Sequence, residues 1–496
     1  MELLENLGSG FAQALTLTNL FYCFIGVTIG TFVGVLPGIG SMIAISLLLP
    51  LTFYLPPDAA LVILAGIYYG GEYGGSIASI MINLPGSASA AVTTLDGYQM
   101  TRNGRSAQAL FLTAIASFVG GSIGIILLAV LSPILADISL RFGPADYFSV
   151  MALGLIAATC ITQGSILKSC GAVVVGILLG TVGTDVNTGV QRFTFGNFDL
   201  YDGISVVIIA MGLFGLPEII ACIGQPEHGS TNTRVRLRDM RPTRQEVRDS
   251  TGPVVRGGLL GSILGALPAT GPTIAAFLSY AMEKRVSRYP ERFGTGIVEG
   301  VTGPEAANNA AAQTAFVPTL TLGIPGSATM ALILGALMIH GIPPGPRLMT
   351  EHADLFWALV ASFWIGNLLL LVLNIPLVGI WIRLLNIPYR FLFPAVVCLT
   401  CVGVYSLKLS GFDVFLVLGI CALGYAMRLL RIDAAPLLMG LILGPMMEEY
   451  FRRALLLSMG DLTVFLTEPI SAGVILSTVV LLLWSAVKGR QLAAKL

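Results

Sequence analysis

Two acidic residues lie in stretches that are otherwise apolar or built of small residues, where an ionised side chain is costly. Glu72 stands in YYGGEYGGS, and Glu305 stands in GVTGPEAANNAAAQ, 233 positions further along the chain. Asn308 and Asn309 follow Glu305 at helical spacing, which places amide oxygens near its carboxylate. Ionisable groups at depth in an apolar segment generally serve ion or proton pathways. We predict Glu72, Glu305, Asn308 and Asn309 as cation-coupling residues; the alternative is that each acid hydrogen-bonds an exposed helix end near the surface.

Two segments that contain glycine and proline would each interrupt a helix: GVLPGIGS at 34–41 and GALPATGP at 265–272. Proline removes a backbone donor and glycine adds chain entropy, so each interruption costs stability. Five positions match at a single offset of 231 residues: Gly26, Gly30, Gly34, Pro37 and Gly40 correspond to Gly257, Gly261, Gly265, Pro268 and Gly271. We assign the glycines spaced four apart to close helix packing. The turns that follow them are candidate binding elements.

A second repeated motif carries hydroxyl groups as well as helix-breaking residues. NLPGSA at 83–88 resembles GIPGSA at 323–328, now 240 positions apart. A single Pro-Gly in a membrane helix is usually only a kink, but two copies flanked by serine and threonine favour a paired site. The predicted substrate-binding residues are Asn83, Pro85, Gly86, Ser87, Pro325, Gly326 and Ser327 in these motifs, and Pro37, Gly38, Gly40, Ser41, Thr270 and Gly271 in the two turns.

The composition indicates which solvent surrounds these breaks. Of the 496 residues, 55% are hydrophobic and 11% are charged, whereas soluble domains carry about 25% charged residues. The mean hydropathy is +0.85, and long apolar runs recur along the chain, for example at 109–131, 204–224, 355–382 and 464–487. Runs of about 20 residues match the hydrocarbon thickness of a bilayer. The sequence therefore predicts an all-α polytopic membrane protein with about 10–12 transmembrane helices.

Irregular backbone at membrane depth persists only where it is buried in protein or lines a watery cavity. Amide groups freed at helix N-termini carry partial positive charge and bind anions without a buried arginine. Freed carbonyls, together with hydroxyl and amide side chains, suit a hard cation such as Na⁺. We expect an anionic substrate and a coupling Na⁺ at the breaks, with no resident metal and no other cofactor. Gly38 and Gly326 are the positions where an added side chain is expected to obstruct the substrate most.

The charge pattern divides the chain into two halves. Residues 1–225 form a first transmembrane repeat, residues 226–256 an arginine-rich linker, and residues 257–496 a second repeat. The linker is cytoplasmic by the positive-inside rule. Residues 257–283 lie between this linker and a second basic loop at 284–292. A re-entrant hairpin that dips into the membrane and returns leaves both basic segments on the cytoplasmic side.

An odd number of crossings in the first half would invert the second half. The two repeats would then have opposite topology, each with a re-entrant hairpin and a broken helix. Such inverted repeats are typical of secondary transporters, which bind substrate where the broken ends meet. Both termini are expected in the cytoplasm. Arg452 and Arg453 fall on the outside in this scheme, against the positive-inside rule.

Three longer motifs carry a resemblance to a known family. They are Gly-x-x-x-Gly-x-x-Pro-Gly-x-Gly at 30–40, YYGGEYGGSIASIMINLPGSASA from Tyr68, and GPEAANNAAAQTAFVPTLTLGIPGSATMA from Gly303. With them the chain, from Asn6 to about Ser485, resembles the large membrane subunit of the tripartite tricarboxylate transporters, the TctA family. One departure concerns the second turn, which reads Pro-Ala-Thr-Gly-Pro instead of Pro-Gly-x-Gly. The two hairpins are therefore expected to contribute unequally.

The resemblance implies a permease subunit in the bacterial inner membrane, crossing it several times. It would work with a small four-helix membrane subunit and a periplasmic solute-binding protein. The implied substrates are di- and tricarboxylates such as citrate, taken up with a coupling cation, Na⁺ or H⁺, by alternating access.

Two other classes of function stay open on the residues alone. An ion channel or passive facilitator would use the Pro-Gly breaks as a selectivity filter, although a channel usually repeats its filter around an axis along the membrane normal. An intramembrane enzyme would need a nucleophile and a base, and no such constellation is recognisable. The zero net charge leaves no footprint for nucleic acid, and the chain contains no phosphate-binding loop for ATP.

Overall fold

The computed structural model describes residues 2–161, 165–185, 188–217, 220, 235–268, 270–385 and 389–493. In these residues the backbone is mostly helical, as expected where peptide groups surrounded by lipid must be satisfied within their own segment. A short antiparallel hairpin interrupts the pattern, with Gly183 opposite Arg192. The predicted all-helical class is confirmed. Residues 226–234 of the predicted linker lie outside the described part.

The elements divide at the linker. Before it lie α1 (Glu2–Ala14), α2 (Leu17–Val35), α3 (Gly40–Thr52), α4 (Pro57–Ile82), η1 (Ser89–Ala91), α5 (Thr93–Arg102), α6 (Ser106–Ser139), α7 (Pro144–Ile161), α8 (Ile166–Gly180), β1 (Gly183–Thr184), β2 (Gln191–Arg192), η2 (Phe198–Leu200), α9 (Val206–Ala210) and η3 (Met211–Gly215). From η4 onward lie η4 (Leu237–Met240), α11 (Arg244–Gly265), α12 (Gly271–Val286), η5 (Pro290–Arg292), α13 (Glu299–Thr314), α14 (Phe316–Leu322), α15 (Ala328–Ile339), α16 (Arg347–Glu351), α17 (Ala353–Asn374), α18 (Val378–Leu384), α19 (Tyr389–Lys408), α20 (Gly411–Leu429), α21 (Ala435–Leu457), α22 (Val464–Thr467) and α23 (Pro469–Ala493).

Four helices in the described residues are long and apolar enough to cross a bilayer by themselves: α2, α6, α17 and α20. Others, such as α3, α7, α8 and α15, are apolar but shorter. The helix breaks are one reason why these helices are short. The segment 59–100, for example, is divided into α4 and α5 by an irregular stretch after Ile82. The fold is that of a multi-pass membrane protein, and the count of 10–12 crossings stays a prediction.

Two glycine ridges hold the helices that carry the buried acids. Gly34 of α2 faces α4, and a Cβ added there would lie 2.3 Å from the carbonyl oxygen of Gly71. Gly261 of α11 faces α13, and a Cβ there would lie 2.2 Å from the carbonyl oxygen of Ala307. The predicted close packing is confirmed, because only glycine lets these helix backbones approach so closely. The remaining ridge positions are equally restricted: Gly26, Gly30, Gly257 and Gly265.

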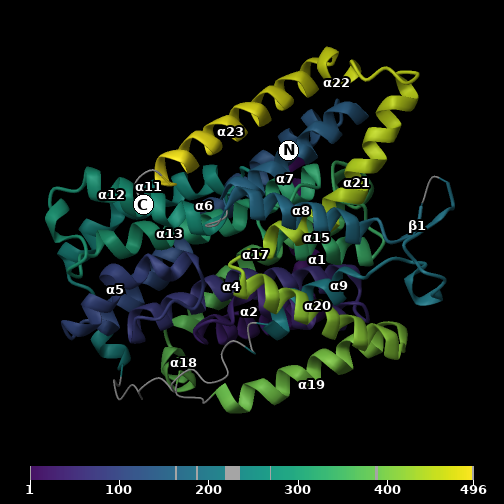
Figure 1. Cartoon of the computed structure of the whole chain (residues 1–496). Helices are drawn as coiled ribbons and strands as arrows, with labels where there is room; N and C mark the ends of the chain where they lie inside the picture. Colours follow the sequence, from purple (N-terminus) through teal and green to yellow (C-terminus); the bar gives the residue numbers. More distant parts are fainter. Residues whose placement is uncertain are drawn as a thin grey trace.

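Each half of the chain packs a long apolar helix against the other half. From the first half, α6 packs against α11 and α13; from the second, α17 packs against α2 and α4 (Figure 1). Polar side chains join both contacts. The Tyr73 hydroxyl of α4 donates to Asn367 of α17 at 2.6 Å, and the Asn309 amide of α13 donates to Ser117 of α6 at 2.8 Å. Each glycine-ridge pair is therefore covered by a helix from the other half, so neither half completes its core alone.

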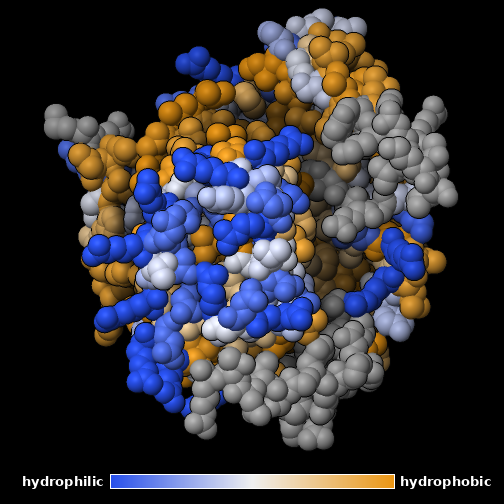
Figure 2. Space-filling view, turned by 90° about the vertical axis from the view of Figure 1, so that its left-hand side faces the viewer, coloured by the Kyte–Doolittle hydropathy of each residue, from blue (hydrophilic) through white to orange (hydrophobic). Residues whose placement is uncertain are grey.

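One end of the molecule, which carries α5 and α12, is hydrophilic (Figure 2). Ion pairs tie its elements together. Arg105, just before α6, pairs with Glu246 in the first turn of α11. Arg256 of α11 pairs with Glu283 of α12 at 2.6 Å, and the Glu283 side chain is almost completely buried. The end of α12 thus lies beside the middle of α11, and the start of α11 meets the loop before α6.

A buried carboxylate fixes the loop between η5 and α13 at the same end. Asp96 of α5 is 0% exposed and accepts hydrogen bonds from the backbone amides of residues 294, 296 and 297 at 2.8–3.1 Å. The Tyr280 hydroxyl of α12 donates to it at 2.9 Å. Because these donors come from the second half and Asp96 from the first, this carboxylate is a further polar link between the halves.

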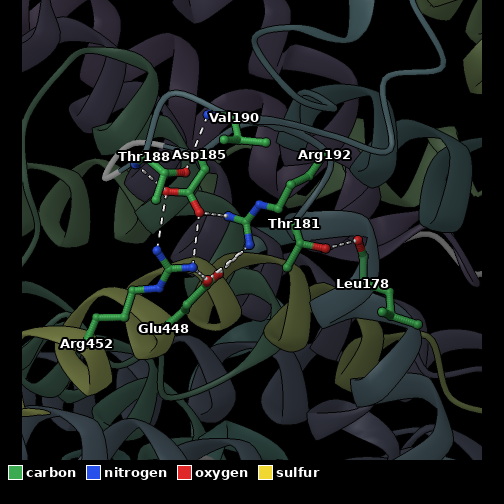
Figure 3. A network of polar contacts seen from close by, with 8 residues as sticks. All are labelled: Leu178, Thr181, Asp185, Thr188, Val190, Arg192, Glu448 and Arg452. Atoms are coloured by element: carbon green, nitrogen blue, oxygen red, sulfur yellow. Dashed lines mark hydrogen bonds and ion pairs between the residues drawn. The ribbon is translucent and has the colours of Figure 1, made fainter. Parts of the chain in front are cut away.

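A network of four charged residues lies at the opposite end, between the β-hairpin and α21 (Figure 3). Arg192 of β2 contacts Asp185 at 3.3 Å and Glu448 of α21 at 3.0 Å. Arg452 contacts the same two acids at 3.1 and 2.5 Å. Arg453 pairs with Glu449, one turn earlier, at 2.6 Å. The two arginines that conflict with the positive-inside rule therefore each have an acidic partner and add little net positive charge.

Candidate functional site

The helix breaks of both halves meet at one cavity of about 780 Å³, here called the central cavity. The α2–α3 turn contributes residues 38–43, and the break after α4 contributes residues 85–89. The α11–α12 turn contributes residues 270–274, and the break before α15 contributes residues 327–329. The start of α21 completes the wall. Ten predicted residues line this cavity: Gly38, Gly40, Ser41, Glu72, Pro85, Gly86, Ser87, Thr270, Gly271 and Ser327.

The other predicted residues are not among those lining the central cavity. Asn83 is exposed and ends α4 in the left-handed conformation, with φ 59°. Gly323 ends α14 in the same way, with φ 71°. Asparagine and glycine are favoured there, so Asn83 has a role in helix termination. The remaining six are Pro37, Glu305, Asn308, Asn309, Pro325 and Gly326.

The position that excludes a side chain is Gly86 rather than Gly326. A Cβ at Gly86 would lie 1.8 Å from the carbonyl oxygen of Gly34, because the α2 ridge is pressed against this break. At Gly326 the nearest atom would be the Ala315 Cβ at 3.5 Å, an ordinary contact. The protein itself therefore leaves room for a side chain at Gly326, and the expected obstruction of the substrate there stays a prediction. Gly38 has φ 82°, a conformation that favours glycine for its backbone alone.

Several helices begin at the central cavity, and two of them lack a side-chain cap. α3 starts at Gly40 and α12 at Gly271, and neither N-terminus is capped by a side-chain hydrogen bond. By contrast, Ser327 caps α15, and at the start of α21 the Ala435 amide donates to the Asp433 carboxylate. Uncapped amides at a helix start carry partial positive charge and bind carboxylate or phosphate groups. The described residues lining the cavity include no lysine or arginine, so these amides are its strongest anion-binding groups.

In the turn between α11 and α12, the Thr270 side chain hydrogen-bonds the backbone of the turn itself. The Thr270 hydroxyl donates to the carbonyl oxygen of Leu267 at 2.8 Å, which closes the turn between α11 and α12. In the first turn, Ser41 is buried at the start of α3 and lines the central cavity. The two turns therefore present different groups to the central cavity, in line with their different sequences.

Glu72 lies in the cavity wall and is only 5% exposed. Its carboxylate accepts hydrogen bonds from the Ser87 hydroxyl at 3.3 Å and from the Ser89 hydroxyl. The two serine hydroxyls are themselves 2.8 Å apart. No basic side chain of the described residues forms an ion pair with Glu72. An ionised Glu72 would thus need a bound cation to balance its charge, or would take up a proton.

Glu305 is completely buried and is bound by hydroxyl groups from three helices of the first half. Ser76 of α4 donates to it at 2.7 Å and Ser117 of α6 at 3.3 Å. Thr93 of α5 donates to the other carboxylate oxygen. All three donors are neutral. Like Glu72, this carboxylate therefore has hydrogen bonds but no compensating positive charge among the described residues.

Sequence reasoning does not find these hydroxyl groups. Ser76, Thr93 and Ser117 belong to the first half and Glu305 to the second, so only the fold brings them together. Ser76 alone carries a signal, because it follows Glu72 by four residues and shares its helix face.

Further amide side chains lie beyond Glu305 on α13. Asn308 and Asn309 are each 1% exposed. The Oδ1 atom of Asn309 and the Oε1 atom of Gln313 have no hydrogen-bond partner in the described part of the chain. Buried oxygens of this kind mark places where water or a cation can bind.

Comparison with known proteins decides the family. The family model for "Tripartite tricarboxylate transporter TctA family" matches residues 20–439. The chain belongs to this family. The TctA family is a transporter family, and membership makes the chain a subunit of a tripartite tricarboxylate transporter, as the resemblance predicts.

Two relatives from Agrobacterium vitis are similar to this TctA-family chain. One is described as an uncharacterized 52.8 kDa protein in the TAR-I ttuC' 3' region. It is 48% identical over 494 residues, which cover 99% of this chain and 98% of the relative. The other, an uncharacterized protein in the TAR-II ttuC' 3' region, is 52% identical over 215 residues, 43% of this chain and 89% of the relative. No solved structure matches the chain.

Proposed function

We propose that this chain is the membrane-embedded permease subunit of a secondary active, binding-protein-dependent transporter for di- and tricarboxylates such as citrate. One observation carries the proposal. The uncapped starts of α3 and α12, one from each half of the chain, meet at a single cavity that no described basic residue lines. Two such helix starts suit a ligand with more than one carboxylate, because each can hold one anionic group. The Ser41 hydroxyl, which lines the same cavity, can hydrogen-bond this ligand as well.

An inverted repeat with re-entrant hairpins would allow this cavity to open alternately to each side. From the Arg256–Glu283 pair to the end of α11 at Gly265 there are nine residues, about 14 Å of helix. That is about half the hydrocarbon thickness, as a hairpin that enters and returns requires. The exchanged packing of α6 and α17 supports a two-fold relation between the halves.

Glu72 and Glu305 are the proposed sites of cation coupling. Glu72 shares the central cavity with the substrate, so a cation or proton bound there would offset the substrate's negative charge. Ser76, which hydrogen-bonds Glu305, lies one turn along the same helix as Glu72. A change of charge at either acid would therefore alter the helix that carries Glu72. Either Na⁺ or H⁺ fits this arrangement.

The partners and location that we propose rest on family membership. They are a small four-helix membrane subunit and a periplasmic solute-binding protein, at the bacterial inner membrane. In this orientation the hydrophilic end of Figure 2 faces the cytoplasm. The positively charged linker segment before α11 supports this choice.

Uptake into vesicles that contain all three components tests the proposal. A panel of radiolabelled di- and tricarboxylates is offered with and without a Na⁺ gradient, and with and without a pH gradient. We expect accumulation above the external concentration of at least one carboxylate, driven by one of the gradients. Equilibration without accumulation would support a channel or passive facilitator instead, and absence of uptake for every carboxylate would refute the proposed substrate class.

A further inference from the structure

A second cavity, of about 690 Å³, lies at the far end of α6 from the hydrophilic end. It is called the outer cavity here. α6 has 34 residues, about 51 Å of helix. Arg105 precedes its first turn and pairs with Glu246 at the start of α11, whereas Ser139 in its last turn lines the outer cavity. The outer cavity is therefore on the opposite face of the molecule from the arginine-rich segment that leads into α11.

Three helices connect the outer cavity with the central cavity. Each of α7, α15 and α21 lines the central cavity near one end and the outer cavity near the other. On α21, for example, Met439 belongs to the central cavity and Met446 to the outer one. The separations along the three helices are 7 to 11 residues, about 10 to 17 Å. The two cavities thus lie one behind the other on the same side of the bundle.

The outer cavity contains the positive charge that the central cavity lacks. Arg347 and Arg453 both line it, together with one acid, Glu449. Arg453 pairs with Glu449 at 2.6 Å, and its guanidinium carbon lies 6.0 Å from the centre of the Tyr450 ring. Arg347 is exposed, and within the described chain no acidic side chain forms an ion pair with it. The cavity therefore holds a net positive charge and one unpaired guanidinium.

Two aromatic rings shape the site around these charges. Tyr147 of α7 and Tyr450 of α21 stack with their ring centres 4.9 Å apart. The Tyr147 hydroxyl donates to the carbonyl oxygen of Ser139 at 2.9 Å, which fixes its ring against the end of α6. Guanidinium groups bind carboxylates through paired hydrogen bonds, and an arginine in a solvated mouth avoids the cost of burying a charge at membrane depth.

We propose that the outer cavity is a capture site for the carboxylate substrate, in which Arg347 binds a carboxylate group before the substrate moves to the amide groups of the central cavity. This inference rests on the proposed function and adds a specific anion-binding residue and a step to it. The two cavities have different charges and would therefore play different roles. Arginine at the solvated mouth attracts and concentrates a polyanion, and the weaker amide charges further in hold it without binding it too tightly to be released.

Initial rates of uptake test this step in the complete three-component transporter. Arg347→Gln is expected to raise the half-saturating carboxylate concentration about tenfold or more, since a hydrogen-bonded charge is lost, and to leave the maximal rate within about twofold. Glu449→Gln removes the acid that competes for Arg453 and is expected not to weaken uptake. Arg141→Gln is the matched control, because Arg141 is exposed beside the outer cavity but does not line it.

Three results would overturn the inference. Unchanged half-saturation in Arg347→Gln, or a fall in maximal rate alone, would leave Arg347 without a role in capture. A weakening in Glu449→Gln as large as in Arg347→Gln would indicate that the ion pairs only hold the structure. If the wild-type transporter takes up no carboxylate at all, the proposed function fails first and this inference falls with it.

Calorimetric titration of citrate into the two membrane subunits separates a solute from other anions. In nanodiscs of phosphatidylcholine, without the binding protein, Arg347→Gln is expected to weaken citrate binding as it does in uptake. An effect of the substitution that requires phosphatidylglycerol would assign the cavity to a lipid headgroup. An effect seen only when the binding protein is present would assign Arg347 to docking of that protein. Either outcome would contradict capture of the carboxylate.

Discussion

Ser76 of α4 donates a hydrogen bond of 2.7 Å to Glu305 of α13, and so joins the two halves of the chain at a fully buried carboxylate. The same hydroxyl lies 3.4 Å from the carbonyl oxygen of Glu72, one turn earlier. The helix that carries one predicted acid therefore hydrogen-bonds the other. This relationship is the physical basis for treating Glu72 and Glu305 as one coupled pair.

Removing the charge of Glu305 is expected to uncouple transport while keeping the fold. Glu305→Gln retains the size of the side chain: its amide oxygen can accept a hydrogen bond from one of the Ser76 and Thr93 hydroxyls, and its NH2 group can donate to the other hydroxyl. We expect exchange of labelled carboxylate across the vesicle membrane to continue, but gradient-driven accumulation to fall at least tenfold. Glu299→Gln, at the half-buried start of the same helix, is the matched control. Normal accumulation in Glu305→Gln would remove Glu305 from the coupling mechanism.

Gly86 and Gly326 occupy the same place in the repeated motif, yet their substitutions are expected to differ sharply. Gly86→Ala forces a Cβ to 1.8 Å from the Gly34 carbonyl oxygen, which we expect to cost about 3 kcal/mol or more because backbone must move. Gly326→Ala meets only ordinary contacts. Thermal unfolding of the detergent-solubilised variants, followed by size-exclusion chromatography, measures the difference. Equal melting temperatures would show that α2 does not press on the break.

The sequence predicts the helix breaks and the glycine ridges because each is a local feature with a clear physical cost. A glycine every four residues is readable as close packing, and the structure confirms it at Gly34 and Gly261. The hydroxyl groups that bind Glu305 cannot be predicted in this way, because Thr93 of α5 and Ser117 of α6 are distant from it in sequence and only the fold brings them near. Gly326 shows the same limit, since the room beside it depends on Ala315 and not on the motif itself.

The outer cavity is also beyond sequence reasoning. Arg347 follows an apolar helix and a proline-rich loop, and nothing in its neighbours distinguishes it from an ordinary interfacial arginine. Arg347 becomes a candidate binding residue only because it shares a cavity with Tyr147 and Tyr450, which lie about 200 residues before it and 100 after it. Arg452 and Arg453 differ in this respect, because Glu448 and Glu449 precede them by four residues, a spacing that pairs opposite charges on a helix.

The Arg105–Glu246 ion pair is expected to give a pH-dependent contribution to stability. Partial burial alone would raise the pKa of Glu246, but hydrogen bonds from the Thr243 amide, from Arg105 and from the Thr243 hydroxyl outweigh it and lower the pKa below the ordinary 4.5. The folded state thus favours the ionised form. This stabilisation is present above about pH 4.5 and is lost as the pH falls through the lowered value of the folded state.

Glu246→Gln should therefore lower the melting temperature at pH 7 and have a smaller effect at pH 3.5. The expected loss at pH 7 is about 0.5–1 kcal/mol, because the Arg105 side chain is 36% exposed and water screens the pair. Differential scanning fluorimetry of the wild type and the variant across this range measures it. A constant difference at all pH values would show that the ion pair is not its source.

The orientation of the two ends is open to cysteine labelling in intact cells. Ser287 follows α12 at the hydrophilic end, and Phe195, which is 91% exposed, lies just after β2 at the other. We expect Phe195→Cys to react with a membrane-impermeant maleimide from outside, and Ser287→Cys to react only after the membrane is opened. The wild type, with its own free cysteines, supplies the background signal. Labelling of both positions from one side would contradict the proposed topology.

The central claim is that amides at the starts of α3 and α12 hold the substrate carboxylates in the central cavity. Cryo-electron microscopy of the complete transporter, saturated with a carboxylate that it transports, tests this claim directly. We predict ligand density between Gly40 and Gly271, with carboxylate oxygens within hydrogen-bonding distance of the first amides of both helices and of the Ser41 hydroxyl. Ligand density elsewhere in the membrane region, bound to a lysine or arginine with the central cavity empty in every conformation resolved, would contradict the account.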